Sequence, residues 1–200
     1  MKPNEFYEEN ADNRTYFYSV DLLGRLFLEE TMPKNIATSL KSDKFLDFFW
    51  RQMRRNDTKR FYDEYPYYSP CGKEHNYVRP ADVGVVFHDF QPSDPKLLIF
   101  GGSLKQKFSP SDLAFSERTG RFYHRLFEGK AKLQRSGREY GLLRSSVAGI
   151  IAADIEFKEC DGDDDGGGGN RNGEIMMFKK NKIKKLPSDQ ESERWGLPPL

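Results

Sequence analysis

The alternation of apolar and polar positions near the N-terminus predicts a β-hairpin over Thr15–Glu30. Two runs of aromatic and aliphatic residues flank the tetrapeptide that begins at Asp21 and ends at Gly24. Aspartate is favoured at the first position of a type I turn and glycine at the fourth. The chain is therefore expected to reverse direction at this tetrapeptide.

A second pattern, with apolar residues at helical spacing, predicts an amphipathic helix after Ser42. Serine is a favoured N-cap because its hydroxyl accepts a hydrogen bond from a free backbone N–H of the first turn. The apolar stripe consists of Phe45, Leu46, Phe49, Trp50 and Met53. Arg54 and Arg55 are expected in the last turn, where the helix dipole favours cations, and the helix is expected to end near Asn56.

Short apolar runs in the middle of the chain predict strands. Segments 83–90 and 96–102 are expected to be adjacent strands, central in a sheet and joined by a proline-containing loop. Residues 109–112 are expected to open a short helical turn and 121–127 to form a further strand. In 143–157 the alternation favours one long strand, although part of it also fits a buried helical segment.

The C-terminal part combines a low-complexity run with a predicted hairpin. Residues 161–173 are mostly glycine and aspartate and can bury no apolar surface, so a mobile loop is expected. A last hairpin is expected to turn at Lys180-Asn181. Together the elements predict an α+β fold, a single domain over 14–187 with flexible ends at 1–13 and 188–200. Its mostly antiparallel β-sheet is expected to carry one clear amphipathic helix packed on it.

Composition limits the classes of protein that fit. A chain of 200 residues can bury a core without metals or disulfides, and with 36% hydrophobic residues its many aromatic rings must fill much of that core. Lys and Arg number 32 against 31 Asp and Glu, so no overall field attracts nucleic acid or an anionic membrane. The longest apolar run, 147–153, is too short to span a bilayer, so no membrane insertion is expected. Cys71 and Cys160 are expected to be reduced in a chain without a signal region.

Candidate metal and cofactor motifs are incomplete. Asp161, Asp163, Asp165 and Gly166 match the first half of a calcium loop, but position twelve is Asn172 instead of a bidentate glutamate. No phosphate-binding loop, dinucleotide fingerprint or hydrolase elbow occurs in the sequence. Neither a metal site nor a cofactor is predicted.

Polar residues around the expected turn near Cys71 are the candidates for a site. Six side chains are candidates for catalysis if they line one cleft: Cys71, Glu74, Arg79, Asp82, Arg121 and His124. Such groups serve acid–base chemistry and anion recognition. His75 lies close enough to Cys71 in sequence for a thiolate–imidazole pair. The alternative is that each of these residues caps a turn or forms a surface ion pair.

Basic residues offer a different site. The lysines of Lys179–Lys185, with Arg51, Arg54, Arg55, Lys59 and Arg60, can form a basic surface for single-stranded RNA. Lysines that protect an exposed hairpin edge against aggregation explain the same pattern. Because the overall charge is balanced, nucleic acid is not the expected partner.

Several segments in order resemble uncharacterised protein family 0598 (UPF0598, the DUF4505 group): YFYSVDLLGRLFLEE, KFLDFFWRQMRRN, YPYYSPCGKEHNYVRPAD, TGRFYH and GLLRSS. The resemblance covers roughly residues 14–158. It implies no activity, cofactor or catalytic residue, and suggests a mitochondrial association, whereas the absence of a targeting segment suggests the cytoplasm. The function expected is a non-enzymatic binding or accessory protein with a possible protein partner. An enzyme using the polar cleft and a weak RNA binder are the alternatives.

Overall fold

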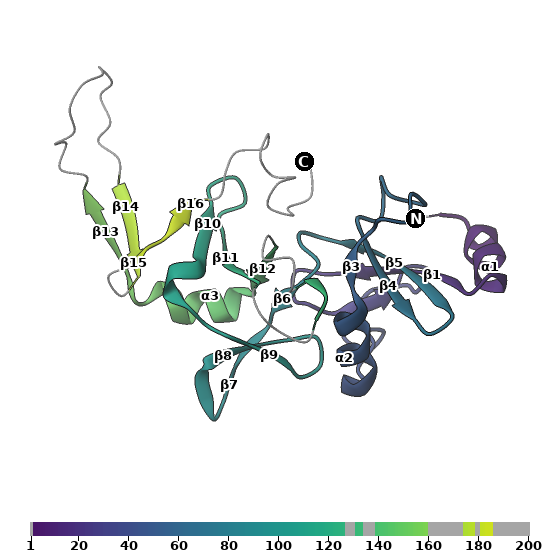
Figure 1. The fold of residues 1–200 in the computed structure, drawn as a ribbon, viewed down its shortest axis with the longest axis horizontal. Helices are drawn as coiled ribbons and strands as arrows, with labels where there is room; N and C mark the ends of the chain where they lie inside the picture. Colours follow the sequence, from purple (N-terminus) through teal and green to yellow (C-terminus); the bar gives the residue numbers. More distant parts are fainter. Residues whose placement is uncertain (1, 127–130, 134–138, 160–173, 179–180, 186–200) are drawn as a thin grey trace, which may run out of the picture.

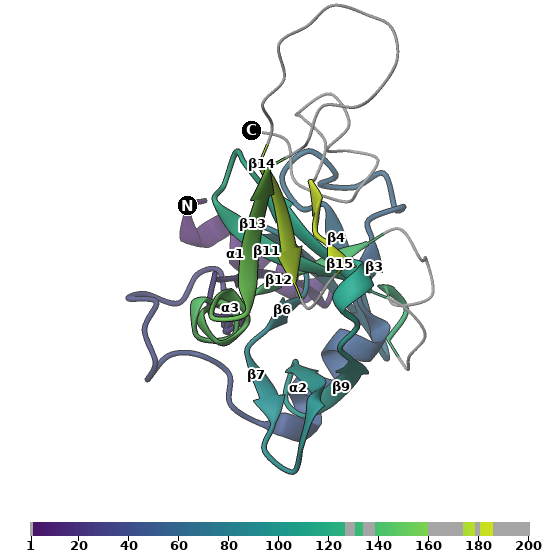
Figure 2. The same cartoon turned by 90° about the vertical axis from the view of Figure 1, so that its left-hand side faces the viewer.

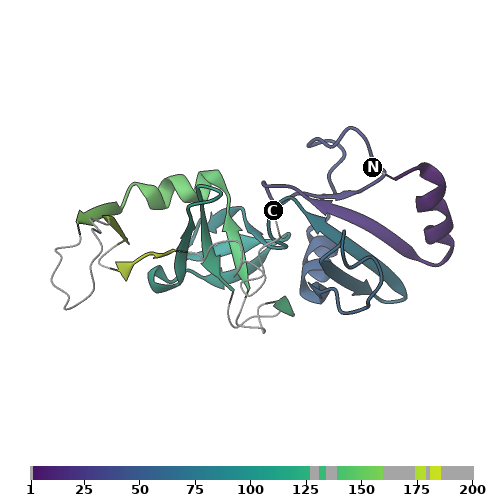
Figure 3. The ribbon, with the colours of Figure 1, turned by 90° about the horizontal axis from the view of Figure 1, so that it is seen from above.

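The computed structural model describes residues 2–126, 131–133, 139–159, 174–178 and 181–185, and it has an α+β fold (Figure 1). Its α-helices are α1 (Asn4–Asp12), α2 (Asp43–Gln52) and α3 (Ser145–Ala152). A short 3-10 turn at Pro110–Asp112 confirms the predicted helical turn. Figures 1 and 3 place α1 at one end of the molecule and the strands β13 (Ile155–Glu159) and β14 (Glu174–Phe178) at the other.

The first sheet is built from the N-terminal part of the chain, in the strand order β2-β1-β5-β4-β3. Its strands are β1 (Thr15–Val20), β2 (Leu26–Leu28), β3 (Arg54–Arg55), β4 (Tyr67–Cys71) and β5 (Glu74–Pro80). The pairing of β1 with β5 is parallel, and the other pairings are antiparallel. β1 and β2 form the predicted hairpin, in which Gly24 adopts a positive φ of 79° and the Asp21 carboxylate accepts the backbone N–H groups of Leu23 and Arg25.

The two faces of this sheet are covered by different elements. Tyr18, Val78 and Tyr67 lie side by side in register and belong to the main core, in which α2 contributes Phe49 and Trp50. Residues on the other face, such as Phe17 and its cross-strand neighbour Tyr77, join a second aromatic cluster with Tyr7, Tyr65 and Tyr68. Period-two alternation along each strand explains this division.

Helix α2 confirms the predicted amphipathic helix at its start but not at its end. The Ser42 side chain accepts a hydrogen bond from the Phe45 N–H, as an N-cap does. The helix ends at Gln52, earlier than expected, and Arg54 and Arg55 form β3 instead of the last turn. Tertiary pairing of these two residues with Tyr68 and Tyr67 on β4 outweighs their local preference for the helix terminus.

The second sheet has the order β16-β10-β11-β12-β6. Its strands are β6 (Val86–Phe87), β10 (Leu113–Ser116), β11 (Arg121–Arg125), β12 (Tyr140–Leu143) and β16 (Lys184–Lys185). Strand β11 confirms the strand predicted at 121–127, although β6 is an edge strand and not the central one expected. β7 (Asp89–Gln91) and β8 (Asp94–Phe100) pair antiparallel, which confirms the predicted pairing of segments 83–90 and 96–102. β8 also pairs antiparallel with β9 (Leu104–Lys107).

Figure 2 shows the β7–β9 sheet beside α2, and hydrogen bonds join the two. The Asp47 carboxylate accepts the backbone N–H of Ser103 at 2.7 Å and its hydroxyl at 2.6 Å. Trp50 donates its indole N–H to the Gly84 carbonyl at 3.1 Å. One helix thereby fixes the first sheet relative to the strands that follow it.

The prediction of one long strand over 143–157 is wrong. The chain leaves β12 at Leu143, forms α3, and resumes as β13 at Ile155. Val147 and Ile151 are the residues that α3 buries, and their spacing of four is helical. Apolar and polar residues alternate in this segment as they do in a strand, but burial of Val147 and Ile151 favours the helix.

Three further predictions concern the chain ends and the C-terminal hairpin. β14 and β15 (Asn181–Lys182) pair antiparallel, which confirms the predicted hairpin, but Asn181 lies in β15 opposite Phe178 and not in the turn as expected. Residues 4–12, expected to be flexible, form α1, which buries Tyr7 against Phe17. The segments 161–173 and 188–200, predicted as a mobile loop and a tail, lie outside the described residues.

Two buried carboxylates connect the first sheet to the second. Glu139, before β12, accepts two hydrogen bonds from Arg55 on β3, at 2.7 and 3.1 Å. Asp82, after β5, accepts hydrogen bonds from the Arg121 guanidinium and the Tyr123 hydroxyl, both at 2.9 Å. Because each carboxylate is nearly inaccessible to solvent, each pair holds the two sheets in one relative position.

Candidate functional site

The six predicted site residues do not share one cleft. Glu74, Arg79 and Arg121 line three different pockets, while Cys71, Asp82 and His124 are buried. Among the described residues, Cys71 and Glu74 are cross-strand neighbours, and Asp82 and Arg121 form a direct ion pair. The alternative interpretation, that such residues form separate ion pairs, describes that contact better than a shared cleft does.

Cys71 is in a setting that suppresses thiolate chemistry. It lies opposite Glu74 in the β4–β5 pairing, with its Sγ 3.6 Å from the Ser69 hydroxyl. Burial raises the pKa of the Cys71 thiol, although its contact with the Ser69 hydroxyl lowers the pKa in part. His75 is not its partner, since the His75 Nδ1 lies 2.6 Å from the Tyr68 hydroxyl.

His124 is fully buried within the second half of the chain. Its ring nitrogens lie within hydrogen-bond distance of the Ser109 N–H and the Arg125 carbonyl. Burial lowers the pKa of His124, and burial likewise lowers the pKa of His88. Tyr123, the neighbour of His124, has its pKa raised to about 12, mainly by burial. These groups are held neutral inside the protein.

Three of the four arginines of the predicted basic surface lie beside carboxylates, and the fourth, Arg60, lies over the Phe61 ring. Arg51 lies 3.8 Å from Asp47, and Arg54 lies 3.9 Å from Asp57. Arg55 is paired with Glu139, as described above. Charge engaged in this way is less available for a phosphate backbone.

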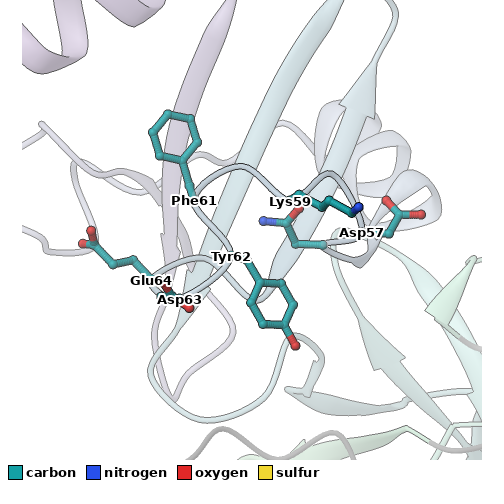
Figure 4. Close-up of a pocket in the computed structure, with 7 residues that line it drawn as sticks. Asp57, Lys59, Phe61, Tyr62, Asp63 and Glu64 are labelled. Carbon is teal, nitrogen blue, oxygen red and sulfur yellow. The ribbon is translucent and has the colours of Figure 1, made fainter.

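The pocket drawn in Figure 4 is formed by the loop between β3 and β4. Three of its seven lining residues are acidic, Asp57, Asp63 and Glu64, and one, Lys59, is basic. Phe61 points away from the labelled acidic side chains and packs in the aromatic cluster. Glu64 is bound to Lys2 at 2.6 Å. Asn56 donates its amide N–H to the Arg60 and Tyr65 carbonyls, so these polar groups serve the loop itself.

A different pocket gathers cations on the first sheet, and we call it the Arg79 pocket. It has a volume of about 490 Å³ and is lined by Ser19, Val20, Asp21, Arg25, Phe27, Lys34, Arg79, Pro80 and Ala81. Three of these residues are cationic and one is acidic. The pairing of the strands explains why they meet, because Ser19 on β1 lies opposite both Phe27 on β2 and Arg79 on β5. Residues paired in this way share one face of the sheet.

A buried carboxylate fixes the orientation of Arg79. Its guanidinium donates to the carboxylate of Glu29, which is only 2% exposed, while the Arg79 side chain itself is 45% exposed. Tyr65 donates its hydroxyl to the other oxygen of Glu29, and the guanidinium also lies 5.6 Å from the centre of the Tyr65 ring. Burial raises the pKa of Tyr65, so this hydroxyl remains a donor. The carboxylate orients Arg79, and part of the Arg79 side chain remains exposed to solvent.

The other two cations of the Arg79 pocket are Arg25 and Lys34. Arg25 donates its Nε–H to Asp21 at 2.6 Å and lies over the Phe27 ring, 5.5 Å from its centre. Lys34 donates to the backbone carbonyl of Glu29 at 2.8 Å. Among the described residues, no carboxylate forms a salt bridge with Lys34.

Ser19 provides the second polar feature of the pocket. Its Oγ is covered from solvent and has no hydrogen-bond partner among the described residues. Such groups are uncommon in folded proteins because losing hydration without a replacement bond is unfavourable. Sequence reasoning identified Arg79 but missed Ser19, Arg25 and Lys34. The hairpin register could have placed Ser19 opposite Phe27, but the parallel pairing with β5 has no local signal.

The described part of the chain contains no group of three or more histidine, cysteine, aspartate or glutamate residues arranged to hold a metal ion. None of its helices combines the length and the apolar character that crossing a bilayer would need.

Comparison with known proteins identifies the class and then the family. The fold is α+β, with mixed and antiparallel sheets, and a family described as a domain of unknown function (DUF4505) matches residues 7–184. The chain belongs to this family. It is also similar to a crystal structure of a DUF1285 family protein from Shewanella baltica OS155, with 14% identity and a TM-score of 0.43 over 69% of this chain and 91% of that chain. A likeness at this level does not establish a shared fold.

Proposed function

We propose that this protein is a non-enzymatic binding protein whose Arg79 pocket takes a small molecule with a carboxylate or phosphate group beside an apolar part. The observation that carries the proposal is the row Phe27–Ser19–Arg79 across the first sheet. It places an apolar ring, an unpartnered hydroxyl and an anchored guanidinium next to one another.

The balance of charge supports an anionic ligand. Three cations line the pocket, and two of them are paired: Arg25 with Asp21 and Arg79 with the buried Glu29. The charge of Lys34 is not balanced by a salt bridge among the described residues. Guanidinium groups bind carboxylates and phosphates with paired hydrogen bonds, and the buried Glu29 fixes the orientation of Arg79 before a ligand arrives. A cation that is already oriented loses less conformational entropy on binding.

The remaining lining supports an apolar part in the ligand. Pro80 and Ala81 supply carbon surface beside the cations, and the buried Val20 and Phe27 complete the apolar lining beneath it. A volume of about 490 Å³ lies within the range of roughly 300–1,000 Å³ usual for small-molecule sites. An inorganic ion alone would leave this surface unused, so an organic anion fits the pocket better.

The test is an NMR titration of the ¹⁵N-labelled full chain with phenyl phosphate and, separately, inorganic phosphate. Both should shift the amide signals of Ser19, Arg25, Lys34 and Arg79, with phenyl phosphate binding more tightly. Lys34→Ala should weaken binding several-fold, since one close cation contributes about 1 kcal/mol at a partly exposed site. Lys73→Ala is the matched control, because Lys73 lies in the turn at the other end of β5.

Two outcomes would count against the proposal. Equal effects of the Lys34 and Lys73 variants would reduce the binding to general charge attraction. Shifts confined to another surface, or no shifts at all, would rule out the Arg79 pocket. Release of phenol from phenyl phosphate, abolished in the Lys34 variant, would instead favour the enzyme alternative.

A further inference from the structure

A second pocket of the first sheet lies on the face opposite to the Arg79 pocket, and we call it the Tyr18 pocket. Neighbouring residues of a strand point to opposite faces, so Tyr18 faces α2 while Ser19 faces the Arg79 pocket. The Tyr18 pocket has a volume of about 410 Å³, within the range of roughly 300–1,000 Å³ usual for small-molecule sites. Rings and aliphatic side chains form most of its lining, from Tyr16, Leu28, Leu40 and Phe45.

The hydroxyl of Tyr18 has no hydrogen bond within the described chain. Tyr18 is only 6% exposed, and its ring centre lies 5.0 Å from that of Phe49 on α2. Buried tyrosine hydroxyls usually find a partner. This one forms no hydrogen bond with a described residue, yet the oxygen is not fully covered, so it meets solvent through the pocket that Tyr18 lines. Burial raises the pKa of Tyr18, and the Glu74 carboxylate raises it further. The hydroxyl therefore stays neutral and can accept as well as donate a hydrogen bond.

Two groups of opposite charge line the same pocket. Glu74 begins β5, and Lys41 directly precedes Ser42, the N-cap of α2. Among the described residues, neither group forms a salt bridge, with the other or with a third residue. Ser42 is already engaged, because its hydroxyl accepts the Phe45 N–H. The pocket thus offers one carboxylate, one ammonium group and one neutral hydroxyl to a ligand.

We propose that the Tyr18 pocket binds a free amino acid with a large apolar side chain. The ammonium group of the ligand binds the Glu74 carboxylate and donates to the Tyr18 hydroxyl. Its carboxylate binds Lys41, and its side chain packs against the apolar lining. This site is separate from the Arg79 pocket, and neither proposal depends on the other.

Other classes of ligand match less of the pocket. An inorganic ion would leave the apolar lining uncovered. A purely apolar molecule would remove Glu74 and Lys41 from water without giving either a partner, which is unfavourable. A simple amine or a simple carboxylic acid would satisfy one charge and desolvate the other. An amino acid carries both charges beside an apolar side chain, so it satisfies both.

Three compounds with the same phenyl ring and carbon chain test the proposal: L-phenylalanine, phenethylamine, which lacks the carboxylate, and 3-phenylpropionate, which lacks the ammonium group. Each is titrated into the ¹⁵N-labelled full chain, and the amide signals of Tyr18, Lys41, Phe45 and Glu74 are followed. Phenylalanine should bind most tightly, and each analogue about threefold more weakly, as expected for one charge contact at a partly exposed site. Binding of a carboxylate in the Arg79 pocket is read separately from the Lys34 signal.

Three variants separate the contacts. Glu74→Gln and Tyr18→Phe should each weaken phenylalanine and phenethylamine, but not 3-phenylpropionate. Lys41→Ala should weaken phenylalanine and 3-phenylpropionate, but not phenethylamine. Lys44→Ala is the matched control, because Lys44 is an exposed lysine in the first turn of α2 that does not line the pocket.

Tyr18→Phe keeps the ring and removes a hydroxyl that has no partner in the described chain, so its urea unfolding should match the wild-type protein. Its weaker binding then reports the hydroxyl and not a loss of folding. An analogue that binds as tightly as phenylalanine, equal effects of Lys41→Ala and Lys44→Ala, or an absence of shifts at the Tyr18 pocket would each overturn the proposal.

Discussion

Ser19 and Arg79 lie directly opposite each other in the parallel pairing of β1 and β5. The hydroxyl of the first is buried and has no hydrogen-bond partner in the described part of the chain, whereas the side chain of the second is anchored by Glu29 and reaches solvent. This relationship gives the Arg79 pocket both an unmet hydrogen-bonding group and a fixed cation. It also allows the binding role of a residue to be separated from its role in stability.

Replacing Ser19 should affect binding and not stability. In Ser19→Ala the unpartnered hydroxyl is removed, so the free energy of unfolding should stay the same or rise by up to about 1 kcal/mol. The affinity for phenyl phosphate should fall. Ser69→Ala is the matched control in the same sheet, because the Ser69 hydroxyl donates to the Phe49 carbonyl at 2.8 Å. This control should lose about 1 kcal/mol of stability and keep its affinity. Urea unfolding measures the stability, and the NMR titration measures the affinity. A loss of stability in Ser19→Ala would show that the Ser19 hydroxyl forms a stabilising hydrogen bond.

The ion pair of Glu29 and Arg79 should respond asymmetrically to mutation. Arg79→Met leaves a carboxylate that is 2% exposed without its cation, which should cost about 3 kcal/mol. Glu29→Gln keeps an acceptor for the Tyr65 hydroxyl and leaves an arginine that water can reach, so about 1–2 kcal/mol is expected. Chemical denaturation of both variants provides the comparison. Equal losses, or a larger loss for Glu29→Gln, would show that burial of the carboxylate does not control the energetics.

Stability should fall as the solution becomes mildly acidic. Burial lowers the folded-state pKa of His124 and of His88 below the ordinary 6.5. Below about pH 6.5 the unfolded chain therefore takes up protons that the folded protein does not, and the free energy of unfolding decreases. Each histidine contributes at most about 1.4 kcal/mol per pH unit within this window.

Urea unfolding at pH 7.5 and at pH 5.5 measures this pH dependence, and His124→Asn should reduce it. The variant will also lose stability at both pH values, so the comparison rests on the difference between them. A difference as large in His124→Asn as in the wild-type protein would mean that other groups cause the acid sensitivity.

Two glycines should respond in opposite ways to alanine. At Gly102 a Cβ would lie 2.6 Å from the Cα of Asp43 and 2.7 Å from its carbonyl oxygen, so Gly102→Ala must displace α2 from the β8–β9 turn. A loss of about 1–3 kcal/mol is expected from such overpacking. Gly149→Ala should gain up to about 1 kcal/mol from helix propensity. Thermal unfolding compares the two variants, and a neutral Gly102→Ala would contradict the tight packing described.

Local interactions explain why parts of the fold follow from the sequence alone. The turn at Asp21–Gly24, the cap at Ser42, the Pro110 turn and the β14–β15 hairpin all involve residues close in sequence. Their side-chain and backbone preferences act on neighbours within a few positions, so the pattern of residue types was enough to predict them.

The tertiary structure decided the elements and contacts that depend on distant partners. Arg54 and Arg55 leave the helix because β4 offers them a strand, and 145–152 becomes α3 because burial of Val147 and Ile151 outweighs a strand-like alternation. The Arg79 pocket depends on the parallel pairing of β1 with β5, strands separated by about a quarter of the chain. No local preference encodes such a pairing, since its free energy comes from the packing of both sheet faces at once. The sequence by itself determined the kind of fold and several of its turns, whereas packing between distant segments determined which polar residues meet.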